Sequence, residues 1–185
     1  GLSPEERRIV AWIDAHADEA VEHLARVVDI NSGTLNLEGV RAVHDAVAPA
    51  FSDIGFDVRW EALPSEMNRA GHLHAERRGS RGRSVLLIGH LDTVFEPDHP
   101  FQRFTRDGNV AHGPGAVDMK GGNTAILYAL RALASVGALE DVTITVVMTG
   151  DEERPGQPLA TTRASLIEAA RRSDVALGFE SSVRD

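Results

Sequence analysis

Cysteine is missing from the 185-residue chain, so the chain has no disulfide framework and no thiolate metal site. No apolar run approaches the ~18 residues that a transmembrane helix requires. No signal peptide is visible at the start of the chain. From these absences we expect a cytoplasmic protein without a membrane partner.

Basic residues are also scarce. Nineteen Lys and Arg residues stand against 28 Asp and Glu residues, which gives a net charge of −9. This balance argues against a nucleic acid or an anionic membrane as partner, and bound cations would neutralise part of the acidic excess. Hydrophobic residues make up 42% of the chain, which indicates one globular domain with a sizeable core.

Hydrophobic spacing predicts a chain in which helices and strands alternate. Ser3 and Pro4 are typical of a helix start, and Asn36 can cap a second helix that stops at Gly55. The predicted helices span residues 3–29, 36–54, 125–136 and 159–172. The predicted strands are half-buried at 56–63, weaker and at an outer position at 71–78, and fully apolar at 84–90, 142–148 and 174–179.

Fully apolar strands that alternate with helices are typical of a sheet buried on both faces. We therefore predict the α/β class, with a mostly parallel mixed sheet covered by helices on both faces. A hairpin is expected about Asp107 and Gly108, in a loop at residues 95–112 that is rich in Pro, Asp and Gly.

The glycine-rich stretch Gly113–Gly122 follows this loop and precedes a helical pattern. Glycine permits positive φ angles and close approach of the backbone, so we interpret the stretch as a loop that holds its only carboxylate, Asp118, in front of the sheet. A phosphate-binding loop is excluded because Lys120 precedes the last two glycines instead of following them. The alternative is a flexible turn.

Ionisable residues follow each of the three apolar strands: His90, the pair Glu152 and Glu153, and Glu180. Ligands of open α/β sheets bind at the carboxyl ends of the strands, so these groups and Asp118 should converge. Four carboxylates in one crevice repel one another unless cations compensate them. An imidazole with carboxylates suits zinc, manganese or cobalt better than calcium, and five groups suggest two ions ~3.5–4 Å apart.

Asp92 lies two residues after His90, so on an extended chain the two side chains share a face. The Asp92 carboxylate can then receive the imidazole N–H and fix the metal-binding tautomer. Simpler interpretations stay open at this point: a core histidine at His90, a solvated charge pair at Glu152 and Glu153, and a surface acid at Glu180.

The early histidines offer weaker alternatives. His16 and His23 lie seven residues apart on the first predicted helix, where surface positions are expected. His72 and His74 share one face of the predicted outer strand and form an alternative metal pair, but no acidic partner lies nearby in the sequence.

Three motifs together resemble the zinc metallopeptidase family of glutamate carboxypeptidase, aminoacylase and succinyl-diaminopimelate desuccinylase. The motifs are Gly89–Val94, Gly113–Gly122 and Thr149–Glu153, and Asn31–Thr34 also fits the early loop of that family. The resemblance implies the phosphorylase/hydrolase-like catalytic domain of zinc exopeptidases. It also implies that residues 1–185 are the N-terminal portion of that domain, truncated before the lid and dimerisation domain.

The resemblance further implies the metal ligands. His90 and Glu180 would bind one zinc ion, Glu153 would bind a second, and Asp118 would bridge both. A complete site would hold two Zn²⁺ ions, with Co²⁺ or Mn²⁺ as alternatives. The peptide bond between Asp118 and Met119 is expected to be cis.

Two catalytic roles and one missing group also follow from the resemblance. Glu152 would be the general base, and Asp92 would orient His90. A fifth ligand, a histidine, would come from a later segment, and within this chain only His99 and His112 are plausible substitutes. His112 stands where the family more often has an aromatic residue.

The expected function is metal-dependent hydrolysis of an amide or peptide bond, most closely that of a carboxypeptidase of the glutamate carboxypeptidase type. The partner would be a small peptide or an N-acyl amino acid, and the full-length protein would be a homodimer through the missing domain. An N-acyl-amino-acid deacylase is the alternative within the family. A non-catalytic metal-binding fragment or scaffold is the alternative of another class, and the 185-residue chain alone is expected to be inactive.

Overall fold

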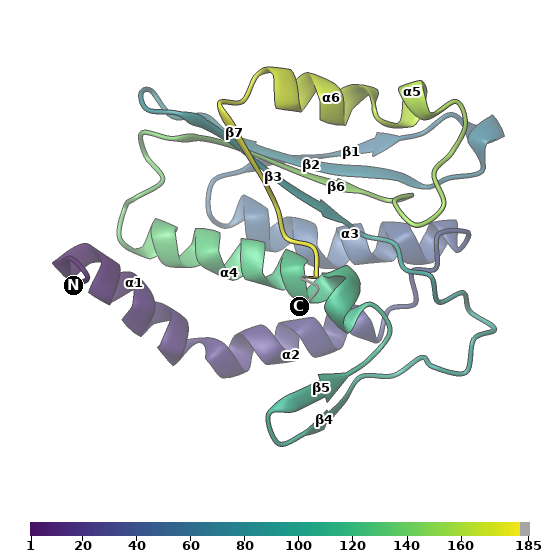
Figure 1. Cartoon of the computed structure of the whole chain (residues 1–185), viewed down its shortest axis with the longest axis horizontal. Helices are drawn as coiled ribbons and strands as arrows, with labels where there is room; N and C mark the ends of the chain where they lie inside the picture. The colour runs from purple at the N-terminus through teal and green to yellow at the C-terminus, as the bar shows by residue number, and fades with distance from the viewer. Residues whose placement is uncertain (182–185) are drawn as a thin grey trace.

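A five-stranded mixed sheet organises the computed structural model, which describes residues 1–181 (Figure 1). The helices are α1 Pro4–Ala15, α2 Ala17–Val28, α3 Leu37–Ser52, α4 Gly121–Ser135, α5 Leu159–Thr162 and α6 Ala164–Arg171. The sheet strands are β1 Asp57–Ala62, β2 Gly71–Arg77, β3 Ser84–His90, β6 Thr143–Thr149 and β7 Val175–Gly178. The separate hairpin consists of β4 Thr105–Asp107 and β5 Val110–His112, and two short helical turns are η1 Ser65–Met67 and η2 Ala116–Lys120.

The strand order β1-β2-β6-β3-β7 places β3 between β6 and β7, and it runs parallel to both. Strands β1 and β2 complete the sheet in antiparallel pairing. The parallel register sets His90 opposite Thr149, so the carboxyl ends of β3 and β6 meet at one edge. The predicted α/β class with a mixed sheet is confirmed, as is the hairpin before the glycine loop.

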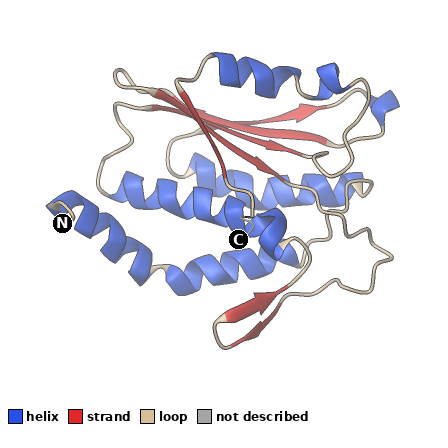
Figure 2. Cartoon of the chain, in the orientation of Figure 1, coloured by secondary structure: helices blue, strands red, loops and turns tan. Residues whose placement is uncertain are grey.

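Helices cover both faces of the sheet, as predicted (Figure 2). The four helices α1–α4 lie on one side, and the short pair α5 and α6 lies on the other. The main core packs α3 and α4 against the sheet through fully buried side chains such as Phe51, Leu73 and Ile126. A smaller cluster under α6 contains Leu86, Val147 and Ala169. No helix among residues 1–181 has the length and apolar character to cross a membrane.

The first predicted helix is divided in the structure. Ser3 caps α1 through a capping box, as expected, but the helix ends at His16, whose φ of −114° and ψ of 12° leave the helical range. The His16 ring stacks on Trp12 at 3.8 Å between centroids and donates from Nδ1 to the Trp12 carbonyl. Helix α1 has no buried residue, and Ile13 is 42% exposed. The helix predicted at 159–172 is likewise divided, at Arg163.

Strand β2 corrects a second expectation. It is not an outer strand but lies between β1 and β6, with residues 71–75 buried. His72 Nε2 donates to the Thr162 carbonyl, and its Nδ1 accepts from the Gly150 amide. His74 Nε2 lies 2.5 Å from Glu61 Oε2 of the neighbouring strand. Both histidines are thus held by structural partners, and neither joins a cluster that can hold a metal among the described residues.

Strand β7 was predicted to be buried on both faces, and this prediction is wrong for the structure. β7 pairs with β3 along one edge only, and Leu177 is 47% exposed. Ala176 and Gly178 are exposed as well. Its apolar sequence is therefore that of an interior strand, whereas within residues 1–181 it forms the edge of the sheet.

Candidate metal centre

The glycine loop is fixed to the body of the protein at both ends. Gly115 has a φ of 71°, and a Cβ atom there would lie 2.5 Å from Thr93 Cγ2, so both conformation and space require glycine. The Lys120 side chain is buried, and its Nζ donates to the carbonyls of Val27 and Ile30 at 2.9 and 2.8 Å. Burial lowers the pKa of Lys120 to about 7. These contacts favour the interpretation of a loop that holds Asp118 in place over that of a flexible turn.

Asp118 itself lies between the two anchors, with the non-helical angles φ −120° and ψ 96°. The peptide bond from Asp118 to Met119 is cis, as the family resemblance implies. The side chain of Met119 is fully buried, while that of Asp118 is 54% exposed. The loop therefore buries its neighbour and leaves the carboxylate free to reach the edge of the sheet.

His90 is the centre of the cluster. It ends β3, and its side chain is fully buried. Its Nε2 lies 3.0 Å from Asp118 Oδ1 and 3.6 Å from Glu180 Oε1. Its Nδ1 lies 2.9 Å from the Asp92 carbonyl oxygen and 3.4 Å from the Asp92 carboxylate. The nearer partner on that side is thus the Asp92 backbone, while Nε2 faces the acids.

Asp92 is fully buried and organises the loop after β6. Its Oδ1 accepts from the Glu152 amide at 3.0 Å, and its Oδ2 accepts from the Glu153 amide at 3.1 Å. Thr34 Oγ1 donates to the same carboxylate at 2.6 Å. Burial alone would raise the pKa of Asp92, but the hydrogen bonds from His90 and Thr34 outweigh it and lower the pKa. An ionised Asp92 therefore fixes the backbone of both glutamates.

Five of the sequence-predicted site residues converge at this edge of the sheet. The ligand atoms of His90, Glu152 and Glu153 lie within 4.8 Å of one another, and so do those of His90, Asp118 and Glu180. The two groups share only the imidazole. Among residues 1–181 no other histidine joins them, so His99 and His112 lie outside both groups.

Charge repulsion is visible in the pKa values of these groups. Burial, and then the negative charge of Asp118, raises the pKa of Glu153 to about 7. The same two causes raise the pKa of Glu180. Burial disfavours the charged form of His90, yet the carboxylates of Asp92, Glu180 and Asp118 raise its pKa to about 9. Without a metal ion, the acids of the cluster therefore bind protons more readily than isolated acids do. A bound cation would favour the ionised form of each acid.

This donor set fits divalent metal ions. Carboxylate oxygens with one imidazole nitrogen match the ligands of zinc, and also those of manganese or cobalt. The two groups of ligand atoms lie side by side and could hold two neighbouring ions, with a carboxylate rather than the single imidazole nitrogen as the bridge. The same closeness of the acids raises the pKa of Glu153, and a bound cation would favour its ionised form.

Sequence reasoning missed several residues that support the cluster. Asn123 Nδ2 donates to the His90 carbonyl at 2.6 Å. Asp151 is fully buried, accepts from Arg163 at 2.5 Å and from the Gly156 amide at 2.8 Å, and so ties the loop after β6 to the start of α6. Only the Asp-Glu-Glu run itself marks Asp151 in the sequence, and no local pattern marks Asn123 or Arg163.

Two cavities with different linings are relevant to the candidate site. One of about 390 Å³ opens between loop 94–101 and the glycine loop, and both Asp118 and Glu153 contribute to its wall. We call this cavity the loop pocket; its main side chains are those of Val94, Phe95, Phe101, His112 and Val117.

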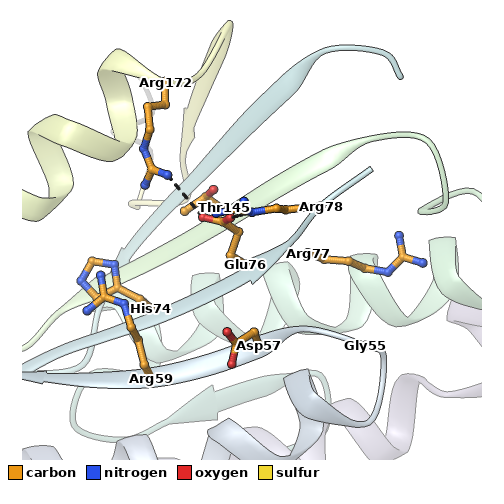
Figure 3. A pocket seen from close by; sticks show the side chains of 9 residues that line it. All are labelled: Gly55, Asp57, Arg59, His74, Glu76, Arg77, Arg78, Thr145 and Arg172. Atoms are coloured by element: carbon orange, nitrogen blue, oxygen red, sulfur yellow. Dashed lines mark hydrogen bonds and ion pairs between the residues drawn. The ribbon is translucent and has the colours of Figure 1, made fainter. Parts of the chain in front are cut away.

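The other cavity, of about 650 Å³, lies beside α6 over β1, β2 and the start of β6, away from the metal cluster (Figure 3). Arg172 reaches down from α6 to Glu76 at 3.5 Å, and Arg78 pairs with the same glutamate. None of its lining residues belongs to either ligand group. This cavity is lined by charged side chains on the part of the sheet face that α6 does not cover.

Known proteins resemble this chain in both sequence and structure. Residues 86–180 match the profile of peptidase family M20/M25/M40. Carboxypeptidase G2 of Pseudomonas sp. (strain RS-16) is 29% identical over 184 residues, which cover 97% of this chain and 43% of that protein. Acetylornithine deacetylase of Salmonella arizonae is 38% identical over 117 residues, which cover 56% of this chain and 27% of that protein.

Human carnosine dipeptidase 1 has a similar structure, with a TM-score of 0.77 at 21% identity over 93% of this chain and 40% of that one. This likeness shows the fold alone, and it agrees with the catalytic-domain fold expected from the sequence motifs. The chain spans less than half the length of the curated relatives it matches here.

Proposed function

Because the chain belongs to peptidase family M20/M25/M40, we propose that the cluster around His90 is the centre of a metal-dependent hydrolase that cleaves an amide or peptide bond. One observation carries the proposal: two groups of ligand atoms share the His90 imidazole at the carboxyl ends of parallel strands. Glu153 and Glu180 are held so close to other acids that their pKa values rise. Such perturbed groups are typical of functional sites.

In this proposal two zinc ions are bound by four side chains of this chain. His90 and Glu180 would hold one ion and Glu153 the other, and Asp118, which lies in the group of His90 and Glu180, would bridge the two. The Asp118 carboxylate lies 3.0 Å from His90 Nε2, and its side chain is 54% exposed, which supports a bridging role. When bound, zinc polarises a carbonyl group and lowers the pKa of water toward ~7.

Glu152 is the proposed general base. It is exposed, whereas Glu153 is half-buried, so Glu152 is free to meet a substrate. Its backbone amide is held by Asp92, which sets where the side chain begins. Glu152 accepts a proton from the attacking water and donates it to the leaving amine, as a general acid–base must. Asp92 does not touch the substrate; it positions His90 and the two glutamates.

The finer assignment is a carboxypeptidase of the glutamate carboxypeptidase type. It is supported by the relative that matches 97% of the chain, a protein named carboxypeptidase G2. The second candidate is an N-acyl-amino-acid deacylase, supported by the higher identity over a shorter stretch to an acetylornithine deacetylase. Both act by the same chemistry on small amides, and a homodimer of the complete protein is part of the proposal.

A histidine from residues outside this chain would complete the ligand set. Among residues 1–181, His99 and His112 are the nearest substitutes in sequence, yet neither joins a ligand group. We therefore expect the 185-residue chain to bind zinc at one site or weakly, and to hydrolyse little.

The test is a zinc titration with a hydrolysis assay on dipeptides and N-acyl amino acids, with and without added imidazole. Free imidazole can take the place of a missing histidine ligand, so it should increase zinc uptake. Two tightly bound ions with turnover and no imidazole would show that the site closes within the chain, and His99 and His112 would then be mutated. A chain that binds zinc but hydrolyses nothing even with imidazole would favour the non-catalytic metal-binding scaffold, and a chain that binds no zinc in either condition would reject the metal-dependent hydrolase.

A further inference from the structure

The loop pocket is open to the same space as the candidate metal centre, because Asp118 and Glu153 form part of its wall. Its volume of about 390 Å³ falls in the range of small-molecule sites. We propose that this pocket binds a large apolar side chain of the substrate residue next to the scissile bond, of the Leu, Met or Phe class. This inference rests on the proposed hydrolase function, and it departs from a preference for glutamate because it assigns an apolar rather than an acidic side chain to the pocket.

Three apolar side chains with large exposed fractions meet at the pocket. Val94 is 56% exposed, Phe101 is 38% exposed and Val117 is 70% exposed. Two of them come from loop 94–101 and one from the glycine loop, so segments distant in sequence supply one apolar surface. Apolar area left in water gains free energy when a ligand covers it, and such a patch beside reactive groups is typical of a binding site.

The first wall is built before any ligand arrives. Phe95 packs edge-on against Phe101 and against His99, with ring centroids 5.3 and 4.9 Å apart. Asn31 Nδ2 donates to the Phe95 carbonyl at 2.9 Å, which ties the loop to the segment after α2. Gln102 Nε2 donates to the His99 carbonyl at 2.7 Å and closes the loop on itself. A wall held this way binds without a large ordering cost.

The second wall is the glycine loop, which the buried Lys120 anchors to the end of α2. Val117 therefore stands at a fixed place beside Asp118, with its side chain in solvent. His112 adds a ring with a polar edge at the end of β5.

Charge decides against an acidic occupant. The pocket wall includes two carboxylates and no Lys or Arg. These carboxylates are the proposed metal ligands Asp118 and Glu153, so a glutamyl or aspartyl side chain would find no basic partner in the pocket and would bury its charge against apolar walls. The cavity beside α6 shows the contrast, since four arginines line it and it lies away from the cluster (Figure 3). A neutral, apolar side chain is the class that fits the loop pocket.

The test measures binding of neutral and acidic probes to the metal-free 185-residue chain by NMR. The probes are N-acetyl-phenylalaninamide, N-acetyl-glycinamide and N-acetyl-glutamic acid amide. The phenylalanine probe should bind ~10-fold more tightly or better than the other two, with shifts at the amides of Val94, Phe101 and Val117. Equal affinities would overturn the proposal, as would shifts centred on the apolar groove beside Leu177.

Matched variants locate the preference. Phe101→Ser and Val117→Ser should each reduce the preference for phenylalanine ~5-fold or more, because each removes apolar wall. Val10→Ser is the control, since Val10 is 43% exposed on α1 and is not part of the pocket. A preference that survives both pocket variants would contradict the proposal.

The two proposals fail in different ways. If the chain prefers the phenylalanine probe but binds no zinc, the hydrolase proposal fails and the apolar pocket stands. If an active preparation hydrolyses amides with kcat/KM no higher for phenylalanyl than for glutamyl substrates, the pocket proposal fails and the hydrolase stands.

Discussion

Glu152 and Glu153 are neighbours in sequence with different surroundings, and this difference separates their proposed roles. The Glu153 side chain is half-buried and faces the charge of Asp118, which suits a ligand, while Glu152 is exposed. In a preparation that hydrolyses substrate, Glu152→Gln should keep its metal content and lose ~10²–10⁴ of kcat. Metal analysis beside steady-state kinetics measures both quantities. Glu168→Gln, on the exposed side of α6, should change neither.

A near-normal rate in Glu152→Gln would reject the assignment of the base. Loss of one ion together with the rate would show instead that Glu152 is a ligand, because its oxygen reaches the same group as Glu153.

His23 gives a prediction about stability that is independent of the metal centre. It lies on α2 with its ring 6.0 Å from that of Tyr128. Burial, and then the positive charges of Arg26 and Arg131, lowers the pKa of His23 to about 4. Between pH 6.5 and about 4 the unfolded chain therefore binds more protons than the folded chain, and stability falls as the pH falls.

From pH 7 to pH 5 this one group should lower the free energy of unfolding by up to about 2 kcal/mol. Urea unfolding at the two pH values measures the change, and His23→Leu should reduce it by that amount. An unchanged pH dependence in the variant would show that His23 is not held neutral by its surroundings.

The candidate ligands and the candidate base were accessible to sequence reasoning, as was Asp92, whereas the other residues that support them were not. His90, Asp118 and Glu153 follow apolar strands or stand among glycines, and both patterns are local. Thr34 and Asn123 act on Asp92 and on the His90 carbonyl across 58 and 33 residues of chain. Threonine and asparagine are common at such distances without any role, so only the folded arrangement reveals these two.

At the scale of elements, the loop after β6 depends on one carboxylate from the end of β3. Asp92 accepts both glutamate amides, and no other described acceptor is available to those two amides. Asp92→Asn replaces one accepting oxygen by a donor, so one of these contacts becomes repulsive. We expect metal affinity to fall ~10–100-fold and hydrogen exchange at both amides to accelerate.

Thr34→Val is the matched control for Asp92→Asn, because it removes one hydrogen bond to Asp92 and leaves both amides paired. It should have a clearly smaller effect on exchange and on metal binding. Equal effects of the two variants would mean that the loop is held by something other than the Asp92 oxygens.

Element boundaries show why periodicity alone was insufficient. The α1–α2 break lies at His16, whose ring stacks on Trp12, and hydrophobic spacing does not encode such a contact. The position of β2 was misjudged because its two histidines look polar, although each is satisfied by a partner from a distant segment. The three parallel strands, in contrast, were identified as strands by their continuous apolar sequence.

For the whole molecule, the exposed edge at β7 is the main liability. Leu177 is 47% exposed and also lines an apolar groove of about 360 Å³ against α4. An apolar edge strand of this kind promotes association. The chain should therefore self-associate as its concentration rises, and Leu177→Lys should weaken this association. Analytical ultracentrifugation measures it.

Leu2→Lys is the control for that edge, because Leu2 is 52% exposed at the other end of the chain and lies outside the groove. If both lysine variants reduce association equally, net charge rather than the β7 edge governs it. A chain that stays monomeric at all concentrations would contradict the prediction.

The position of β6 between β2 and β3 has a consequence for synthesis on the ribosome. β3 ends at residue 90, but the strand that pairs with it and with β2 is complete only at residue 149, about 60 residues later. At ~5–20 residues per second this interval lasts roughly 3–12 seconds. During it, the apolar run Val85–Ile88 has no sheet to join, so the nascent chain presents a binding site for a chaperone until Thr143–Thr149 emerges.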